Sequence, residues 1–128
     1  MSIKSTTKLK ICGTAALGLL LLFCALGPGK WQVRTGLGWQ VDHVVGYFGF
    51  TIMFCLAWPR PFVVGGILMA AAMLLEYLQS FTPDRCCDLQ AALDGAAGAL
   101  AATLVADLFI RRNGRLLLTR VGSRLSSR

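Results

Sequence analysis

Charge is scarce in this 128-residue sequence and missing from long stretches of it. Only 15% of the residues are charged and 55% are hydrophobic, which is too apolar for an ordinary soluble domain of this length. Four runs contain no basic residue, at 11–26, 41–58, 61–75 and 89–108. Helices of this size reach about 22–30 Å, close to the bilayer hydrocarbon thickness of about 30 Å. The shortage of charge therefore excludes a soluble domain and predicts transmembrane helices.

Residue types that carry catalysis are also few. The chain has a single histidine, His43, so it lacks a metal-spaced histidine pair, and it contains neither a Walker loop nor a Ser–His–Asp order. Three of its five cysteines lie inside the apolar runs, where cysteine acts as a small hydrophobic side chain. The adjacent Cys86 and Cys87 are weak evidence for a soft metal. We predict no metal and no cofactor, and a non-enzymatic role is favoured.

The apolar runs predict an all-α membrane protein, a bundle of four transmembrane helices in a single domain covering 1–128. We expect helices at about 11–27, 41–58, 61–81 and 88–110, followed by a basic cytoplasmic tail at 111–128. The two shorter runs carry aromatic residues near their ends, and these side chains suit the membrane interface.

The 13 basic residues are divided unequally between the two sides that four alternating helices create. One side holds ten of them: Lys4, Lys8, Lys10, Arg60, Arg111, Arg112, Arg115, Arg120, Arg124 and Arg128. The other side holds Lys30, Arg34 and Arg85. Because basic residues favour the cytoplasmic side, both termini are predicted to be cytoplasmic. This asymmetry accounts for the net charge of +7 without a nucleic-acid partner.

Both ends of the chain leave alternatives open. The run at 11–26 suits either an uncleaved first helix or a secretory signal peptide, and its length favours the uncleaved helix. Near the other end, Leu117, Val121 and Leu125 share a helical face beside a row of arginines. That pattern suits a helix on the anionic cytoplasmic membrane surface. The alternative is a disordered basic tail that serves only the topology.

Small residues at helical spacing predict where the helices pack, because they let backbones approach closely in lipid. The third helix carries one stripe of small and polar residues: Gly65, Met69, Ala72, Glu76 and Gln79. The fourth carries another: Ala91, Gly95, Gly98 and Ala102. Gly46 and Gly49 predict a further close helix contact in the second helix.

Polar residues at membrane level gather between 76 and 98 and at the start of the second helix. Glu76 and Gln79 project from neighbouring positions of one helical face, and Pro83 ends that helix. The candidate binding residues are Asp42, His43, Glu76, Gln79, Arg85, Asp88 and Asp94. Most of them belong to the outer helix ends, and Asp94 lies about 9 Å further in than Asp88. This arrangement predicts a shallow polar pocket at the outer leaflet.

Each charge in the cluster needs a physical reason to be there. A charge at the bilayer centre costs about 2.5–3.5 kcal/mol, falling towards the interface. Glu76 is therefore expected to have a partner, either Arg85 or a proton. Arg85 also has the forked donor geometry that suits phosphate or carboxylate. His43 beside a carboxylate suits acid–base chemistry. We expect Asp88 to mark a helix end, and Asp94 to be protonated or to form an interhelical hydrogen bond.

A family resemblance covers about residues 40–105. It rests on Asp42-His43 opening a helix, on LAWPR at 56–60, on the pattern E-x-x-Q-x-x-x-P-x-R from Glu76 to Arg85, and on a glycine-bearing last helix. Together these features resemble the VanZ-like family. The resemblance implies a small bacterial membrane protein of a family named for a member linked to glycopeptide antibiotic resistance, with no settled biochemical activity. It also implies that the family's polar positions correspond to Asp42, Glu76, Gln79 and Arg85.

Four positions depart from the family's pattern. Ala91 and Gly95 stand where the family often has an aspartate and another polar residue. His43 takes the place of a basic residue, and Gly46 that of a frequent histidine.

Three functions suit these observations. The first is a non-enzymatic envelope protein in contact with membrane lipids, whose outward pocket binds a polyprenyl-linked or peptidoglycan-derived anionic group, or a partner helix. The second is a membrane-embedded hydrolase or transferase acting on a lipid phosphate, with His43 or Glu76 as acid and base and Arg85 holding the phosphate. The third is a structural subunit that packs into a larger complex through Gly95 and Gly98.

Overall fold

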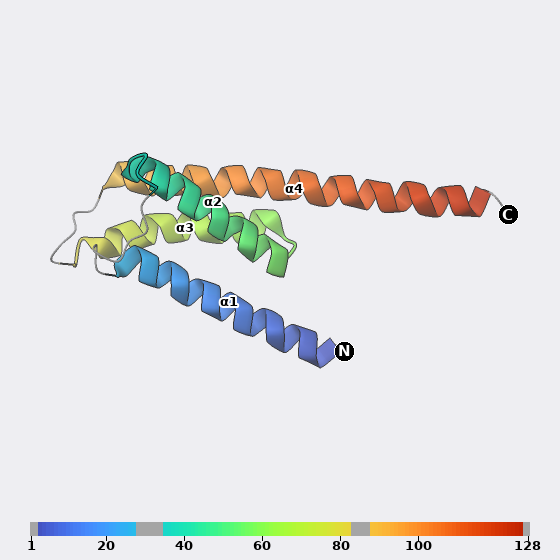
Figure 1. Cartoon of the computed structure of the whole chain (residues 1–128), viewed down its shortest axis with the longest axis horizontal. Helices are drawn as coiled ribbons and strands as arrows, with labels where there is room; N and C mark the ends of the chain where they lie inside the picture. The colour runs from blue at the N-terminus through green and yellow to red at the C-terminus, as the bar shows by residue number, and fades with distance from the viewer. Residues whose placement is uncertain (1–2, 28–34, 83–87, 127–128) are drawn as a thin grey trace.

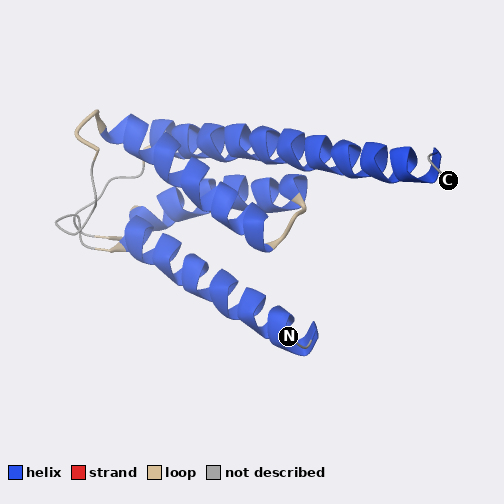
Figure 2. Ribbon diagram, turned by 45° about the vertical axis from the view of Figure 1, so that its right-hand side comes forward, coloured by secondary structure: helices blue, strands red, loops and turns tan. Residues whose placement is uncertain are grey.

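The computed structural model describes residues 3–27, 35–82 and 88–126, with side chains described between Thr6 and Asn113 in these ranges. All regular structure in this part of the chain is helical (Figures 1 and 2). The helices are α1 (Ile3–Leu26), α2 (Trp39–Ala57), α3 (Pro61–Gln79) and α4 (Leu89–Ser126).

Each of the four helices is long and apolar enough to cross a membrane. The candidate spans are Thr6–Leu26, Trp39–Ala57, Pro61–Gln79 and Leu89–Asn113. Large apolar side chains on the outer faces, such as Leu19, Leu56 and Leu104, are exposed, as lipid-facing side chains are. The sequence-based expectation of four spanning helices is confirmed, and the chain is a multi-pass membrane protein.

The helix bounds differ from the expected ones at both ends of the chain. Helix α1 begins at Ile3, ahead of the expected start at 11, so the N-terminal lysines at 4, 8 and 10 are helical. Helix α4 continues to Ser126, past the expected end at 110. Its 38 residues correspond to about 57 Å at 1.5 Å per residue, longer than a bilayer core. The backbone beyond the span is therefore a direct continuation of α4, and Figure 1 shows it extending past the other helices.

Helix α4 is the centre of the packing, because both α2 and α3 pack against it much more than against each other. Its small-residue stripe faces them: Ala91, Gly95, Gly98 and Ala102 are all buried. A Cβ at Gly98 would collide with the Val44 carbonyl oxygen of α2, and one at Gly95 would lie 2.8 Å from the Tyr47 ring. The predicted seam is confirmed, and it is occupied by helices of the same chain.

The corresponding stripe of α3 also faces inward. Gly65, Ala72, Glu76 and Gln79 are buried, and Met69 is half-buried and packs against the core. The expectation for Gly46 and Gly49 is wrong, since a Cβ at either position would meet nothing within 4 Å. Helix α2 instead turns the neighbouring face inward, the one that carries buried Tyr47, Thr51, Phe54 and Cys55.

Helix α1 is the least buried of the four, and it contacts α2 and α3 but, within the described residues, not α4. Figures 1 and 2 show it closest to the other helices near its C-terminal end and diverging towards its N-terminus. Leu21 joins the core cluster, and Trp58 Nε1 donates a hydrogen bond of 2.7 Å to Thr14 Oγ1. These contacts make α1 part of the folded bundle.

The alternating helices bring four helix termini together at one end of the bundle. There α1 and α3 end while α2 and α4 begin, and we call this the polar end. Both chain termini lie towards the opposite end (Figure 1). The connection at the opposite end is the tight turn before Pro61, which occupies the first position of α3, where a missing N–H costs nothing.

Candidate functional site

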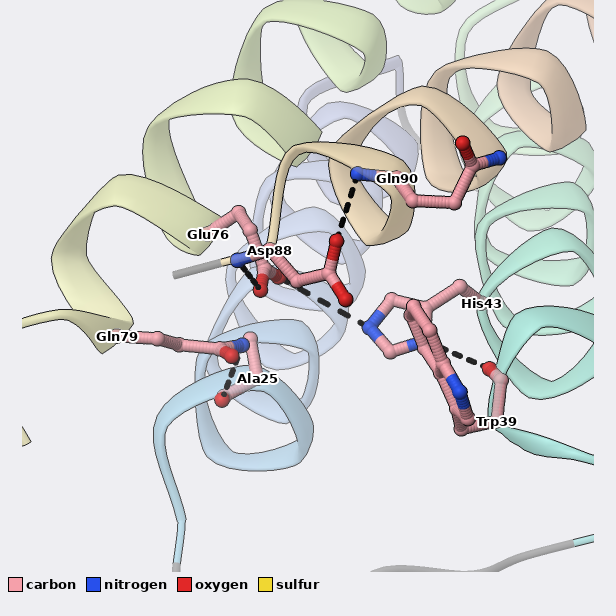
Figure 3. A network of polar contacts seen from close by, with 7 residues as sticks. All are labelled: Ala25, Trp39, His43, Glu76, Gln79, Asp88 and Gln90. Carbon is pink, nitrogen blue, oxygen red and sulfur yellow. Dashed lines mark hydrogen bonds and ion pairs between the residues drawn. The ribbon is translucent and has the colours of Figure 1, made fainter. Parts of the chain in front are cut away.

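The polar end collects side chains from α2, α3 and the start of α4 (Figure 3). Glu76 of α3 occupies the middle of this cluster. Its residue exposure is only 5%, because it follows Ala72 by one helical turn on the face that packs against α4. A carboxylate this buried needs hydrogen bonds or a counter-charge, and both of its oxygens face polar groups.

The first oxygen of Glu76 holds the start of α4. The backbone N–H of Asp88 donates to Glu76 Oε1 at 3.0 Å. Asp88 in turn caps the helix: its Oδ1 accepts from the Gln90 N–H at 2.8 Å, and its carbonyl accepts from the Ala92 N–H at 3.2 Å. These are the bonds of an N-cap aspartate. Asp88 thus marks a helix end.

The second oxygen of Glu76 faces the histidine. His43 Nε2 lies 4.0 Å from Glu76 Oε2, while His43 Nδ1 lies 2.8 Å from the Trp39 carbonyl oxygen. Because a carbonyl can only accept, Nδ1 carries the proton, and Nε2 is the nitrogen turned to Glu76. The Trp39 ring meets the imidazole edge-on, with centroids 5.8 Å apart. Two contacts with Trp39 therefore fix the orientation of His43.

Gln79 has a structural partner. It is 7% exposed, and its Nε2 donates a hydrogen bond of 2.9 Å to the Ala25 carbonyl oxygen. That carbonyl belongs to the last turn of α1, where backbone carbonyl oxygens have no N–H partner within their own helix. Gln79 therefore ties the end of α1 to α3, and its amide nitrogen faces α1.

Asp42 connects the preceding loop to α2. Its Oδ1 accepts hydrogen bonds from the Thr35 backbone N–H at 2.8 Å and from Thr35 Oγ1 at 2.5 Å. It also lies in the first turn of α2, where a negative charge suits the helix dipole. Asp42 thus stabilises the beginning of the helix that carries His43.

Asp94 lies one turn beyond Gln90 along α4. Its Oδ1 accepts from Gln90 Nε2 at 3.0 Å, so its hydrogen bond is intrahelical and not the expected interhelical one. The other oxygen, Oδ2, is buried and has no hydrogen-bond partner within the described residues. A buried oxygen without a partner is energetically costly, and the alternative expectation for Asp94, that it is protonated, stays a prediction.

Arg85 lies outside the described residues, with Asp84, Cys86 and Cys87. Its predicted pairing with Glu76 and its predicted phosphate contact are therefore not described. The residues on either side of this segment, Thr82 and Asp88, are both at the polar end.

Sequence reasoning missed two groups of the site. Trp39 is not among the candidate residues, yet its carbonyl and ring both hold His43, and the signal was its position four residues before the histidine. Ala25 supplies the carbonyl that binds Gln79, and nothing in its residue type points to this. Within the residues that the structure describes, no group of three His, Cys, Asp or Glu side chains is placed to hold a metal ion.

Comparison with known proteins adds no relative. No protein-family model matches the chain, and neither a curated protein nor a solved structure matches it significantly.

Proposed function

We propose that this protein is a VanZ-like protein of the bacterial inner membrane whose polar end faces outward and binds an anionic, lipid-linked or cell-wall-derived group such as a polyprenyl phosphate. The observation that carries the proposal is the joining of His43, Glu76 and Asp88 from three helices at one end of the bundle. The unequal division of basic residues supports the orientation.

Under this proposal, the carboxylates and the cations of the polar end have different roles. Glu76 and Asp88 are already committed to the start of α4, so they act as the frame of the site. The cations predicted on this side are Lys30, Arg34 and Arg85, and His43 joins them when it is protonated. Arg85 belongs to a five-residue segment whose flanking residues are held at the polar end. Its fork would take two phosphate oxygens.

An enzymatic role is the second candidate. The geometry of His43 favours it over the third candidate, a structural subunit of a larger complex. An imidazole whose Nδ1–H is held by a carbonyl presents Nε2 for proton transfer, and His43 has this arrangement. Such a protein would hydrolyse or transfer a lipid phosphate. The third candidate, assembly through Gly95 and Gly98, loses its surface because α2 and α3 of the same chain already occupy it.

A binding and turnover experiment distinguishes the first two candidates. Protein in lipid nanodiscs is incubated with polyprenyl phosphate or polyprenyl pyrophosphate, and bound lipid and released phosphate are measured. Binding without release supports the binding protein. Release that is lost in Glu76→Gln and His43→Ala supports the enzyme. If neither lipid binds more tightly than a neutral polyprenol, the proposed ligand class is wrong.

Arginine variants locate the anion. Arg85→Ala and Arg85→Lys should weaken polyprenyl phosphate binding alike if the fork is needed, whereas Lys should rescue binding if only charge matters. Arg112→Ala is the matched control, since Arg112 is an exposed arginine near the opposite end. Unchanged binding in both Arg85 variants would remove this residue from the site.

A further inference from the structure

The contact between His43 and Glu76 joins two helices that otherwise touch little. Helices α2 and α3 pack mainly against α4 and only slightly against each other. At the polar end, however, His43 Nε2 of α2 and Glu76 Oε2 of α3 are 4.0 Å apart. The pair is therefore a polar contact between α2 and α3 at the polar end, in addition to their packing against α4.

The sign of that interaction depends on the number of protons that the pair holds. The Trp39 carbonyl fixes a proton on Nδ1, so a neutral imidazole turns the lone pair of Nε2 to Glu76 Oε2. With no further proton, a lone pair faces a carboxylate and the contact is repulsive. With one proton on His43, the contact is an ion pair at 4.0 Å. With that proton on Glu76 instead, a carboxyl O–H faces the lone pair of Nε2. With two protons, an imidazolium faces a neutral acid and the charge attraction is lost.

The two groups differ in their access to water. The side chain of His43 is 29% exposed and that of Glu76 only 6%. His43 is therefore the more accessible group of the pair. Burial of Glu76 also strengthens the interaction, since charges in a medium of low dielectric constant attract more strongly.

Other titratable groups surround the pair. Asp42 and Tyr47 lie on the same helix as His43, and Asp88 and Asp94 come from α4. The Asp88 backbone N–H occupies Glu76 Oε1, and the Asp88 carboxylate accepts the Gln90 N–H. Asp84 and Arg85 lie outside the described residues.

We propose that His43 and Glu76 form a one-proton link that fastens α2 to α3 at the polar end, and that gain or loss of this proton releases it. Because Glu76 also holds the N–H at the start of α4, the proton state of the pair is transmitted to the ends of three helices. The protein would thus respond to the acidity of the compartment that the polar end faces, whichever ligand binds there.

The test uses the fact that His43 is the chain's only histidine. Labelling with ¹⁵N-histidine gives NMR signals from this residue alone, in the full-length protein in nanodiscs. In the parent, the neutral imidazole is expected to carry its proton on Nδ1. The ¹⁵N signals identify this tautomer without any variant. Over a pH series, the signals of the two ring nitrogens should change differently in the parent and in Glu76→Gln, because the group that faces Nε2 is altered. Asp107→Asn, which removes a carboxylate near the opposite end of the span, should match the parent.

A double-mutant cycle tests the mechanical part of the link. Unfolding equilibria of the parent, His43→Gln, Glu76→Gln and the double variant are compared over a pH series. The coupling between the two sites should be at least about threefold in the unfolding constant at pH values where the pair holds one proton. It should fall towards onefold at lower pH, where the charge attraction is lost, and to onefold or below at higher pH, where the contact is repulsive. A neutral imidazole protonated on Nε2, the same pH profile of the ring signals in the parent and in Glu76→Gln, or a coupling that does not change with pH would each overturn the proposal.

Discussion

The Glu76 carboxylate and the Asp88 backbone N–H are joined by a hydrogen bond of 3.0 Å, so a side chain near the end of α3 holds the first turn of α4. The two residues are separated by a proline-containing segment, and the bond brings its two sides together. The same carboxylate faces His43. One buried acid thus connects three helices at the polar end. Replacing Glu76 should show whether the fold needs the shape and acceptor oxygen of this side chain or its negative charge.

Glu76→Gln should keep the fold, because the amide oxygen can still accept the Asp88 N–H. Glu76→Lys should not, since lysine has no acceptor and places a cation beside His43. An unsatisfied buried donor alone costs about 1–3 kcal/mol. Protein abundance in membranes and thermal stability in mild detergent measure the difference. A lysine variant as abundant and as stable as the parent would mean that this side chain faces water.

Gly98→Ala should destabilise the bundle. The new Cβ would collide with the Val44 carbonyl, whose carbon is 3.0 Å away, and backbone cannot move aside as a flexible side chain can. Overpacking of this kind costs about 1–3 kcal/mol. Gly66→Ala is the matched control in α3, because its Cβ would meet nothing within 4 Å. Thermal unfolding in detergent compares the two, and equal melting temperatures would argue against the close contact of α2 with α4.

Gln79→Ala should weaken the hold on α1, since it removes the hydrogen bond to Ala25. Interhelical hydrogen bonds in membranes contribute about 0.6–2 kcal/mol. A protease site inserted between α1 and α2 allows the measurement: after cleavage, the fraction of α1 that stays bound in mild detergent should fall in the variant. Gln90→Ala, which replaces an exposed glutamine of α4, should retain α1 like the parent. Loss of α1 from the parent itself after cleavage would show that its contacts are too weak to hold it.

The orientation of the protein can be tested with its own cysteines. A membrane-impermeant maleimide added to intact cells after mild reduction should label Cys86 and Cys87, which are predicted to face outward. Because Cys24 is exposed near the polar end of α1, the test is cleanest in a Cys24→Ser background. Cys86→Ser/Cys87→Ser should then abolish labelling, as a buried thiol such as Cys55 reacts slowly. Labelling that appears only after lysis would place the polar end in the cytoplasm.

The sequence was informative about those features of the site that depend on a single helix and its own neighbouring residues. The end-marking role of Asp88 is readable because an aspartate before a helix caps its own backbone. The inward stripe of α3 is readable because residues three or four apart share a face. The expectation that small residues on one face mark a close helix contact failed for Gly46 and Gly49. Their small size permits such a contact, but within the described residues no helix lies against them.

What the sequence determined by itself is the number of spans and their order. Apolar runs of this length cross a bilayer whatever they pack against, because the backbone satisfies its hydrogen bonds within each helix. The tertiary structure decided which residues meet: Gln79 binds the carbonyl of Ala25, 54 residues away, and Glu76 lies between His43 and the start of α4. A periodic pattern identifies the buried face of one helix but contains no information on the rotation and depth of its neighbours. The rotation and depth of each helix depend on the packing of all four helices at once. The geometry of the polar end depends on that packing too.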